Sequence, residues 1–132
     1  MEGFKATICE SSRQLTTKER IKFKDTTGAV SIDRTSIDKD FNNEKFIINV
    51  EGYVVLDIHN EKAQDNTDYK NYIIIDKDGT KYVTGSKSFF SSFMDIWQEL
   101  EEAGELDDFQ IEVYRQPSKN YSGKDFLTCT IV

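Results

Sequence analysis

The sequence predicts a single, mainly β domain: a small β-barrel with one main helix, preceded by an N-terminal extension. Short β-rich runs recur through the C-terminal two thirds of the chain. The pair Asp78-Gly79 is typical of a two-residue hairpin turn, which needs positive φ at both central positions. Only one stretch, 88–103, repeats its apolar residues at helical spacing. A length of 132 residues fits one domain.

Five strands and one helix are expected after residue 45. The strands are predicted over 46–59, 72–75, 81–84, 109–114 and 127–131. The first is long and contains Gly52, which suggests a strand that bends at a glycine bulge. The helix presents one apolar face made of Phe89, Phe93, Ile96, Trp97 and Leu100. Ser86 or Ser88 can cap its start, and Gly104 is placed to end it.

This order of elements favours an OB-fold-like, five-stranded, partly open barrel with its helix between strands 3 and 4. A strand bent at a glycine suits a small barrel, because one strand must turn a corner. Other α+β meanders share the same order. We therefore divide the chain into an extension, 1–45, that packs on the barrel, and an OB-like domain, 46–132.

The extension contains weaker signals. Residues 4–8 alternate as a short strand does, and residues 29–33 are a second short strand. Thr16 and Glu19 have the spacing of a capping box, which predicts one or two helical turns over 17–24. Those turns are basic, with Lys18, Arg20, Lys22 and Lys24.

Composition excludes several classes of protein. No apolar run approaches the ~18–20 residues of a membrane span, and the N-terminus lacks the hydrophobic stretch of a signal peptide. We therefore expect no membrane association and a cytoplasmic location. The two cysteines are too few and too distant in sequence for a zinc site. Cys129 is expected in the core, and a disulfide to Cys9 is the less favoured alternative.

The sequence gives little support to an enzyme. His59 is the only histidine and ends an apolar strand, so a strand-terminal surface histidine explains it better than a catalytic base. No glycine pattern matches a phosphate-binding loop. Asp76 and Asp78 resemble the start of a calcium loop but lack the later ligands. No catalytic residue, cofactor or metal is expected.

The acidic residues are unevenly distributed. The formal net charge is −7, but residues 95–112 contain eight acidic side chains and no basic one. The rest of the chain has 16 acidic and 17 basic residues, so it is close to neutral. Outside the acidic segment, tyrosines and cations gather on the predicted strands 2 and 3 and in the loop 116–124.

These positions match the surfaces with which OB-folds bind their ligands. In binding of single-stranded nucleic acid, aromatic rings stack on bases and cations follow the backbone. Tyr82 and Tyr121 are the principal stacking candidates, with Tyr53 and Tyr72 as weaker ones. The candidate phosphate contacts are Lys81, Lys87, Arg115, Lys119 and Lys124. The alternative for each tyrosine is an ordinary strand position with its hydroxyl in water.

The C-terminal half resembles a known family. The pattern comprises the segment 72–86 with its hairpin, the apolar helix, the strand 109–113 and the segment 118–131. It is similar to single-stranded DNA-binding proteins of phages and prophages of Gram-positive bacteria, including those of small protein-primed Bacillus phages. The resemblance implies an OB-like protein that coats and protects single-stranded DNA during phage replication, without sequence preference, in the cytoplasm of the bacterial host. It also implies base stacking by Tyr82.

A rival hypothesis starts from the acidic segment 95–112. Its carboxylates could mimic a DNA backbone, and the chain would then be a phage protein that binds and inhibits a host protein. In the first hypothesis the same segment could dock replication proteins. The sequence leaves open the oligomeric state, the preference for DNA or RNA, and the role of residues 1–45.

Overall fold

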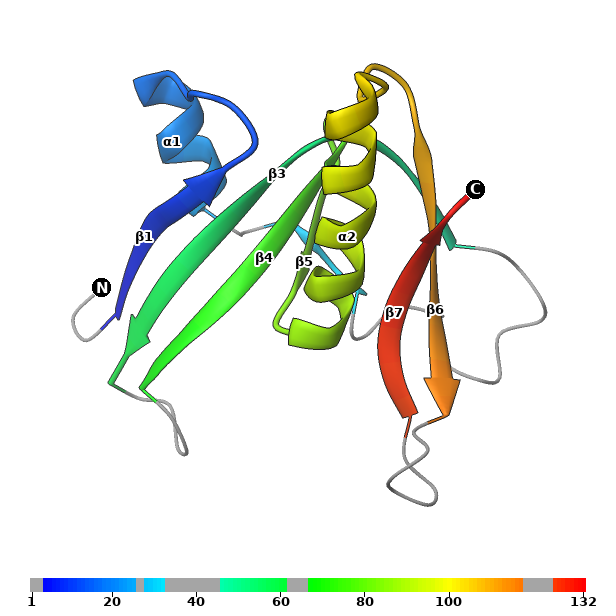
Figure 1. The fold of residues 1–132 in the computed structure, drawn as a ribbon. Helices are drawn as coiled ribbons and strands as arrows, with labels where there is room; N and C mark the ends of the chain where they lie inside the picture. Colours follow the sequence, from blue (N-terminus) through cyan, green and yellow to red (C-terminus); the bar gives the residue numbers. More distant parts are fainter. Residues whose placement is uncertain (1–3, 26–27, 33–45, 62–66, 118–124) are drawn as a thin grey trace. The chain divides into compact units, whose positions relative to one another are not determined.

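The structure is a computed structural model that describes residues 4–25, 28–32, 46–61, 67–117 and 125–132 (Figure 1). This part of the chain is mainly β with two helices, which confirms the predicted class. Its strands are β1 (Phe4–Ser11), β2 (Val30–Ser31), β3 (Phe46–Asn60), β4 (Asp68–Asp76), β5 (Lys81–Thr84), β6 (Gln110–Pro117) and β7 (Asp125–Ile131). Its helices are α1 (Thr17–Lys24) and α2 (Lys87–Ala103).

The chain forms two compact units. Unit 1 contains Met1–Ser31 and Glu51–Gly85, and unit 2 contains Ile32–Val50 and Ser86–Val132. The boundary falls inside β3, one residue before Gly52. On the unit 2 side, β3 pairs with β6. On the unit 1 side it pairs with β1.

The strand order in the sheet is β2-β5-β4-β3-β6-β7, with β1 also paired to β3. Within it, β6 returns after α2 to pair with β3, the first of the consecutive strands β3, β4 and β5. That strand order is a Greek key. The sequence of elements predicted from residue 46 onward is confirmed, with α2 between β5 and β6. Two strands are clearly longer than predicted: β4 begins at Asp68 instead of Tyr72, and β6 extends to Pro117, into the predicted loop 116–124.

The predicted short strands of the N-terminal extension are part of the sheet. β1 runs antiparallel to β3, from the pair Phe4↔Asn60 to the pair Ser11↔Val54, and its register shifts between Ile8 and Glu10. β2 runs parallel to β5. The described strands of the extension, β1 and β2, therefore contribute backbone pairing to strands that follow them in the chain.

One core cluster of unit 1 lies on one face of its strands. Val54, Leu56 and Ile58 of β3 alternate toward that face and pack with Ile73 of β4. Leu15 and Phe23, before and within α1, cover this cluster. Burial of these apolar groups holds α1 on the sheet, because a helix of eight residues is too short to be stable alone.

The core of unit 2 is built on α2. Phe89, Phe93 and Trp97 are buried. The rings of Phe89 and Phe93 stack, and the ring of Trp97 is tilted against Phe93 and meets Phe109 edge-on. These side chains form the face that the sequence predicts. The start and end of the helix are also as predicted. The Ser86 hydroxyl accepts a hydrogen bond from the amide of Phe89, and Gly104 ends the helix at φ 72°.

Two further predictions concern the state of the cysteines and the absence of a membrane-spanning helix. Both cysteines are free thiols, and Cys129 is buried in unit 2, as predicted. Burial raises the pKa of its thiol to about 12. Within the described ranges, neither helix combines the length and apolar character that a membrane crossing requires.

Candidate nucleic-acid interface

The predicted DNA-binding residues are distributed over both units. Four belong to unit 1: Tyr53, Tyr72, Lys81 and Tyr82. Lys87, exposed at the first position of α2, and Arg115 of β6 belong to unit 2. Arg115 is described only by its backbone pairing with Leu127. Lys119, Tyr121 and Lys124 lie outside the described residues.

Tyr53 and Tyr72 are core residues in the structure. Their exposed fractions are 6% and 5%, so neither ring offers an open face for a base. Tyr53 is also fixed by its backbone, since its amide donates to the Ser12 hydroxyl and its carbonyl accepts from the Ser12 amide, both at 3.0 Å. The sequence could not separate these tyrosines from surface ones, because β3 and β4 bury residues on both faces along part of their length.

Lys81 and Tyr82 are neighbours on β5, and successive strand residues point to opposite faces. The ammonium group of Lys81 donates to the backbone carbonyls of Lys22, at 3.0 Å, and Asp25, at 2.7 Å. It therefore satisfies carbonyl groups at the C-terminal end of α1, which a helix leaves unpaired. Lys81 anchors α1 to β5, a role that its sequence position did not indicate.

Tyr82 is half-buried on the other face of β5, opposite Ile74 of β4. Burial and the nearby carboxylates of Asp76 and Asp78 raise the pKa of its hydroxyl group. These carboxylates belong to the hairpin turn that the sequence predicts at Asp78-Gly79. The hairpin is confirmed, but its loop has three residues, 77–79, instead of the predicted two: Asp76 pairs with Thr80, the Gly79 amide donates to the Asp76 carbonyl, and Gly79 has φ 94°. The surroundings of Tyr82 thus suit ring contact better than phosphate contact.

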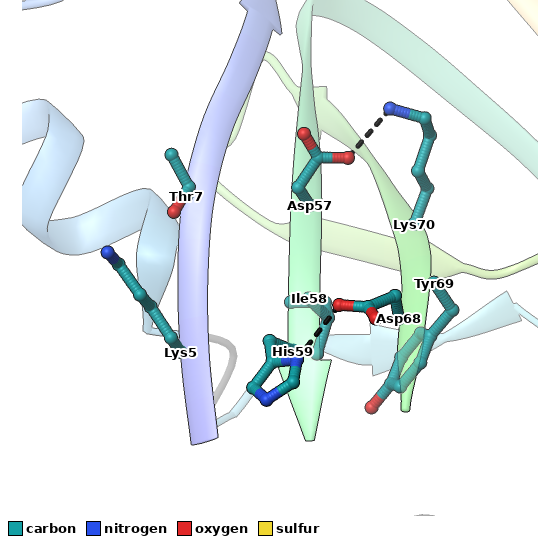
Figure 2. Close-up of a pocket in the computed structure, with 8 residues that line it drawn as sticks. All are labelled: Lys5, Thr7, Asp57, Ile58, His59, Asp68, Tyr69 and Lys70. Carbon is teal, nitrogen blue, oxygen red and sulfur yellow. Dashed lines mark hydrogen bonds and ion pairs between the residues drawn. The ribbon is translucent and has the colours of Figure 1, made fainter. Parts of the chain in front are cut away.

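A polar patch lies on the exposed end of β1, β3 and β4, around a pocket of about 440 Å³ (Figure 2). Strand register sets its layout, since Lys5 pairs with His59 and Thr7 pairs with Asp57. The patch comprises Lys5, Thr7, Asp57, Ile58, His59, Asp68, Tyr69 and Lys70.

Most charges of the polar patch are matched within it. Lys70 donates to the carboxylate of Asp57 at 2.7 Å, and His59 Nδ1 lies 2.8 Å from Asp68 Oδ1. The hydrogen bond from Lys70 lowers the pKa of Asp57, and the one to Asp68 raises the pKa of His59. Glu61 adds a further carboxylate, 3.6 Å from His59 Nε2. An approaching phosphate would meet three carboxylates here, so the patch is a poor site for a polyanion.

Helix α1 presents the opposite situation. Its cations Lys18, Arg20, Lys22 and Lys24 are all exposed, and none forms an ion pair with another described residue. The one carboxylate within the helix, Glu19, is held by Arg13 and by the Thr16 amide in the predicted capping box. These contacts lower the pKa of Glu19 to about 2. Four exposed cations on one short helix, without an ion-pair partner in the part of the chain that the structure describes, are the strongest polyanion-binding feature described in unit 1.

The charges of the two units differ. Unit 1 has ten Lys and Arg against eleven Asp and Glu, whereas unit 2 has seven against thirteen. Seven of the eight acidic side chains in 95–112 are exposed, and Glu112 is half-buried. The cations of α1 thus belong to a nearly neutral unit, and the acidic segment is confined to the other.

Neither a metal site nor an activated thiol is found among the described residues. Among them, no group of three or more His, Cys, Asp or Glu side chains is placed to hold a metal ion. Cys9 Sγ lies 3.6 Å from Lys70 Nζ, but burial and Asp57 raise the pKa of the thiol. A raised thiol pKa disfavours the thiolate that a nucleophile needs.

Comparison of the chain with models of protein families, with curated proteins and with solved structures finds no match. The geometry of the site and the resemblance described above are therefore the basis for a functional proposal.

Proposed function

We propose that this chain binds single-stranded DNA without sequence preference, and that it coats and protects the strand during phage replication. The observation that carries the proposal is the set of four exposed cations on α1 that form no ion pair with any residue the structure describes. Cations on one helix contact a phosphate backbone whatever its sequence, because the phosphates carry no base identity. The affinity for the strand then depends on the number of these cations and on the salt concentration.

The strand order supports an OB-like barrel for this function. A Greek key formed by β6, β3, β4 and β5 is the arrangement from which a partly open OB barrel is built. Lys81 ties α1 to β5, the third strand of that Greek key. In OB-folds the second and third strands form part of the ligand surface. The proposed phosphate contacts therefore begin at α1, next to a strand of that surface.

Tyr82 and Tyr121 are proposed to stack on bases. The predicted phosphate contacts of Lys87, Arg115, Lys119 and Lys124 also belong to the proposal. Each stacked base contributes roughly 1–3 kcal/mol, and stacking tolerates any sequence because every base has a π-face. Tyr53 and Tyr72 are left out because both rings are buried.

The proposal is tested by fluorescence anisotropy with three labelled probes of equal length: oligothymidine, a DNA duplex and an oligouridine. We expect tighter binding to oligothymidine than to the duplex, since only unpaired bases offer stacking faces. The oligouridine measures the preference for DNA over RNA. Absence of binding to oligothymidine at low salt would reject the proposal, whatever the oligouridine shows.

The exposed acidic side chains of 95–112 favour one second candidate, inhibition of a host DNA-binding protein by mimicry of DNA charge. The two candidates make opposite predictions for one double variant, Glu101→Gln/Glu102→Gln. Neutralising these carboxylates would leave oligothymidine binding intact or strengthen it, whereas it would weaken an inhibitor of a basic protein. Lys22→Gln serves as the reciprocal variant, because it weakens only the DNA complex.

A further inference from the structure

Helix α1 exposes an apolar side chain in the middle of its basic surface. Ile21 is 64% exposed, as much as any large apolar side chain that the structure describes. At 100° per residue, Ile21 lies nearly opposite Phe23, which packs on the core. Lys18 and Lys24, three residues before and after it, lie on either side of Ile21. The exposed face of α1 is thus an apolar knob between cations.

Unit 2 carries a surface with the complementary properties. An apolar hollow of about 290 Å³ lies between α2 and β7, lined by Ile96, Leu100 and Ile131 together with Asp95 and Glu99. Asp95 and Glu99 are one helical turn apart, so their carboxylates form one rim of the hollow. Both are exposed, and neither forms an ion pair with a described residue.

A further depression adjoins this hollow and reaches the segment between α2 and β6. This depression shares Leu100 and Ile131 with the hollow and adds Glu105, Asp108 and the exposed Val132. The two together, which we call the acidic groove, join the apolar floor of the hollow to a more polar depression that Asn49 and Gln110 also line, and carboxylates border both. Exposed apolar groups rimmed by charge are typical of a surface that binds a partner.

We propose that the acidic groove of one copy binds helix α1 of a second copy of this chain. Ile21 would enter the apolar floor, while Lys18 and Lys24 would meet Asp95 and Glu99. Ile21 and the floor of the groove are both apolar, and the charges that flank them are opposite in sign. The contact joins two different surfaces, so it is heterologous and can continue from copy to copy.

One helix of eight residues covers a small area, below that of stable dimers, so the association is weak. Its charged rim makes the association sensitive to salt, because salt weakens the attraction between exposed charges and shortens its range to about 10 Å at 0.1 M. It also uses the cations that the proposed function assigns to phosphates. One consequence rests on the proposed function: single-stranded DNA should dissociate the assembly, because its phosphates compete for the same cations.

The first experiment uses the full chain without nucleic acid. Sedimentation velocity at low salt, over a wide range of protein concentration, should show a weight-average sedimentation coefficient that rises with concentration and falls when salt is added. Ile21→Ser and Glu99→Lys should each abolish the rise. Glu101→Lys is the matched control, since Glu101 projects about 200° around α2 from Glu99, and it should associate as wild type does.

The second experiment mixes two variants. Ile21→Ser retains an intact acidic groove, and Glu99→Lys retains an intact α1, so a heterologous contact predicts that the mixture forms pairs although each variant alone is monomeric. A wild type that stays monomeric would overturn the proposal, as would Ile21→Ser associating normally or a mixture that forms no pairs. Circular dichroism confirms that each variant is folded. Because no DNA is present, these outcomes are independent of whether the chain binds DNA.

Discussion

Lys70 and Asp57 form an ion pair of 2.7 Å across β4 and β3, on the exposed face of unit 1. The pair shows why the number of cations on a surface does not identify a polyanion site. Lys70 has its charge matched by a neighbour, whereas Lys22 on α1 has no ion-pair partner among the described residues. This difference supplies a matched comparison within one unit.

Removing a matched cation and removing an unmatched one should have different effects on DNA binding. Lys22→Gln should weaken oligothymidine binding severalfold and reduce the slope of log K against log salt by about 0.7, the amount that one neutralised phosphate contributes. Lys70→Gln removes the same charge from unit 1 and should change neither quantity appreciably. Anisotropy titrations at several salt concentrations measure both. Equal effects of the two variants would contradict the assignment of phosphates to α1.

The ring of Tyr82, rather than its hydroxyl group, should matter for DNA binding. Tyr82→Ala should cost roughly 1–3 kcal/mol of binding free energy, the contribution of one stacked base. Tyr82→Phe keeps the ring and should bind as wild type does. Thermal unfolding of both variants distinguishes an effect on binding from an effect on folding. If Tyr82→Ala binds normally while folded, the stacking role is wrong.

Acid should destabilise α1 through Glu19. Its pKa in the folded chain is about 2, below the ordinary value of 4.5, because Arg13 and the Thr16 amide stabilise the carboxylate. A lowered pKa contributes stability that is complete above pH 4.5 and is lost as the pH falls toward 2. Glu19→Gln should remove this part of the acid dependence. Hydrogen exchange of the α1 amides measures it, and an unchanged dependence in Glu19→Gln would rule out the capping box as its source.

Asp68 should control the titration of His59. The hydrogen bond to Asp68 is the main cause of the raised pKa of His59, with a smaller contribution from Glu61. A raised pKa contributes stability that is present at low pH and is lost as the pH rises through the folded-state value. Asp68→Asn should therefore move the His59 pKa down toward its ordinary 6.5. NMR titration of the imidazole measures the shift, and an unmoved pKa would show that the hydrogen bond is not formed.

Gly52 should be required by the hydrogen bond between Ser12 and Tyr53. A Cβ at position 52 would lie 2.6 Å from the Ser12 hydroxyl, which accepts from the Tyr53 amide. Gly52→Ala should displace that hydroxyl and cost about 1–3 kcal/mol of unfolding free energy, the range for a buried donor left unsatisfied. In a Ser12→Ala background the same change should cost less, because the bond is already absent. Urea denaturation of the four chains tests this coupling.

Local patterns predicted the elements well because each depends on neighbouring residues. Such patterns are the capping box at Thr16, the hairpin signal at Asp78-Gly79 and the apolar face of α2. The structure contains all three features, although the hairpin loop has three residues where two were predicted. The start of β4 was missed, since the polar run 68–71 has the composition of a loop. Its pairing with the rest of the sheet is a long-range property that composition does not carry.

The candidate site was harder to predict, because it depends on what each side chain meets. Tyr53 and Tyr72 differ from surface tyrosines only through burial. The anchoring role of Lys81 requires α1 to lie beside β5, although the two are far apart in sequence. The basic run in α1 was visible in the sequence, but its importance follows from the lack of ion-pair partners among the described residues.

Binding of oligothymidine as a function of salt, compared between wild type and the quadruple variant Lys18→Gln/Arg20→Gln/Lys22→Gln/Lys24→Gln, tests the central claim most directly. We expect wild-type affinity to fall steeply between about 50 and 200 mM salt, with a slope of about −0.7 for each phosphate neutralised. The quadruple variant, folded by circular dichroism, should bind weakly and with a much smaller slope. A wild-type affinity that does not change with salt, or a quadruple variant that binds like wild type, would contradict DNA binding through α1.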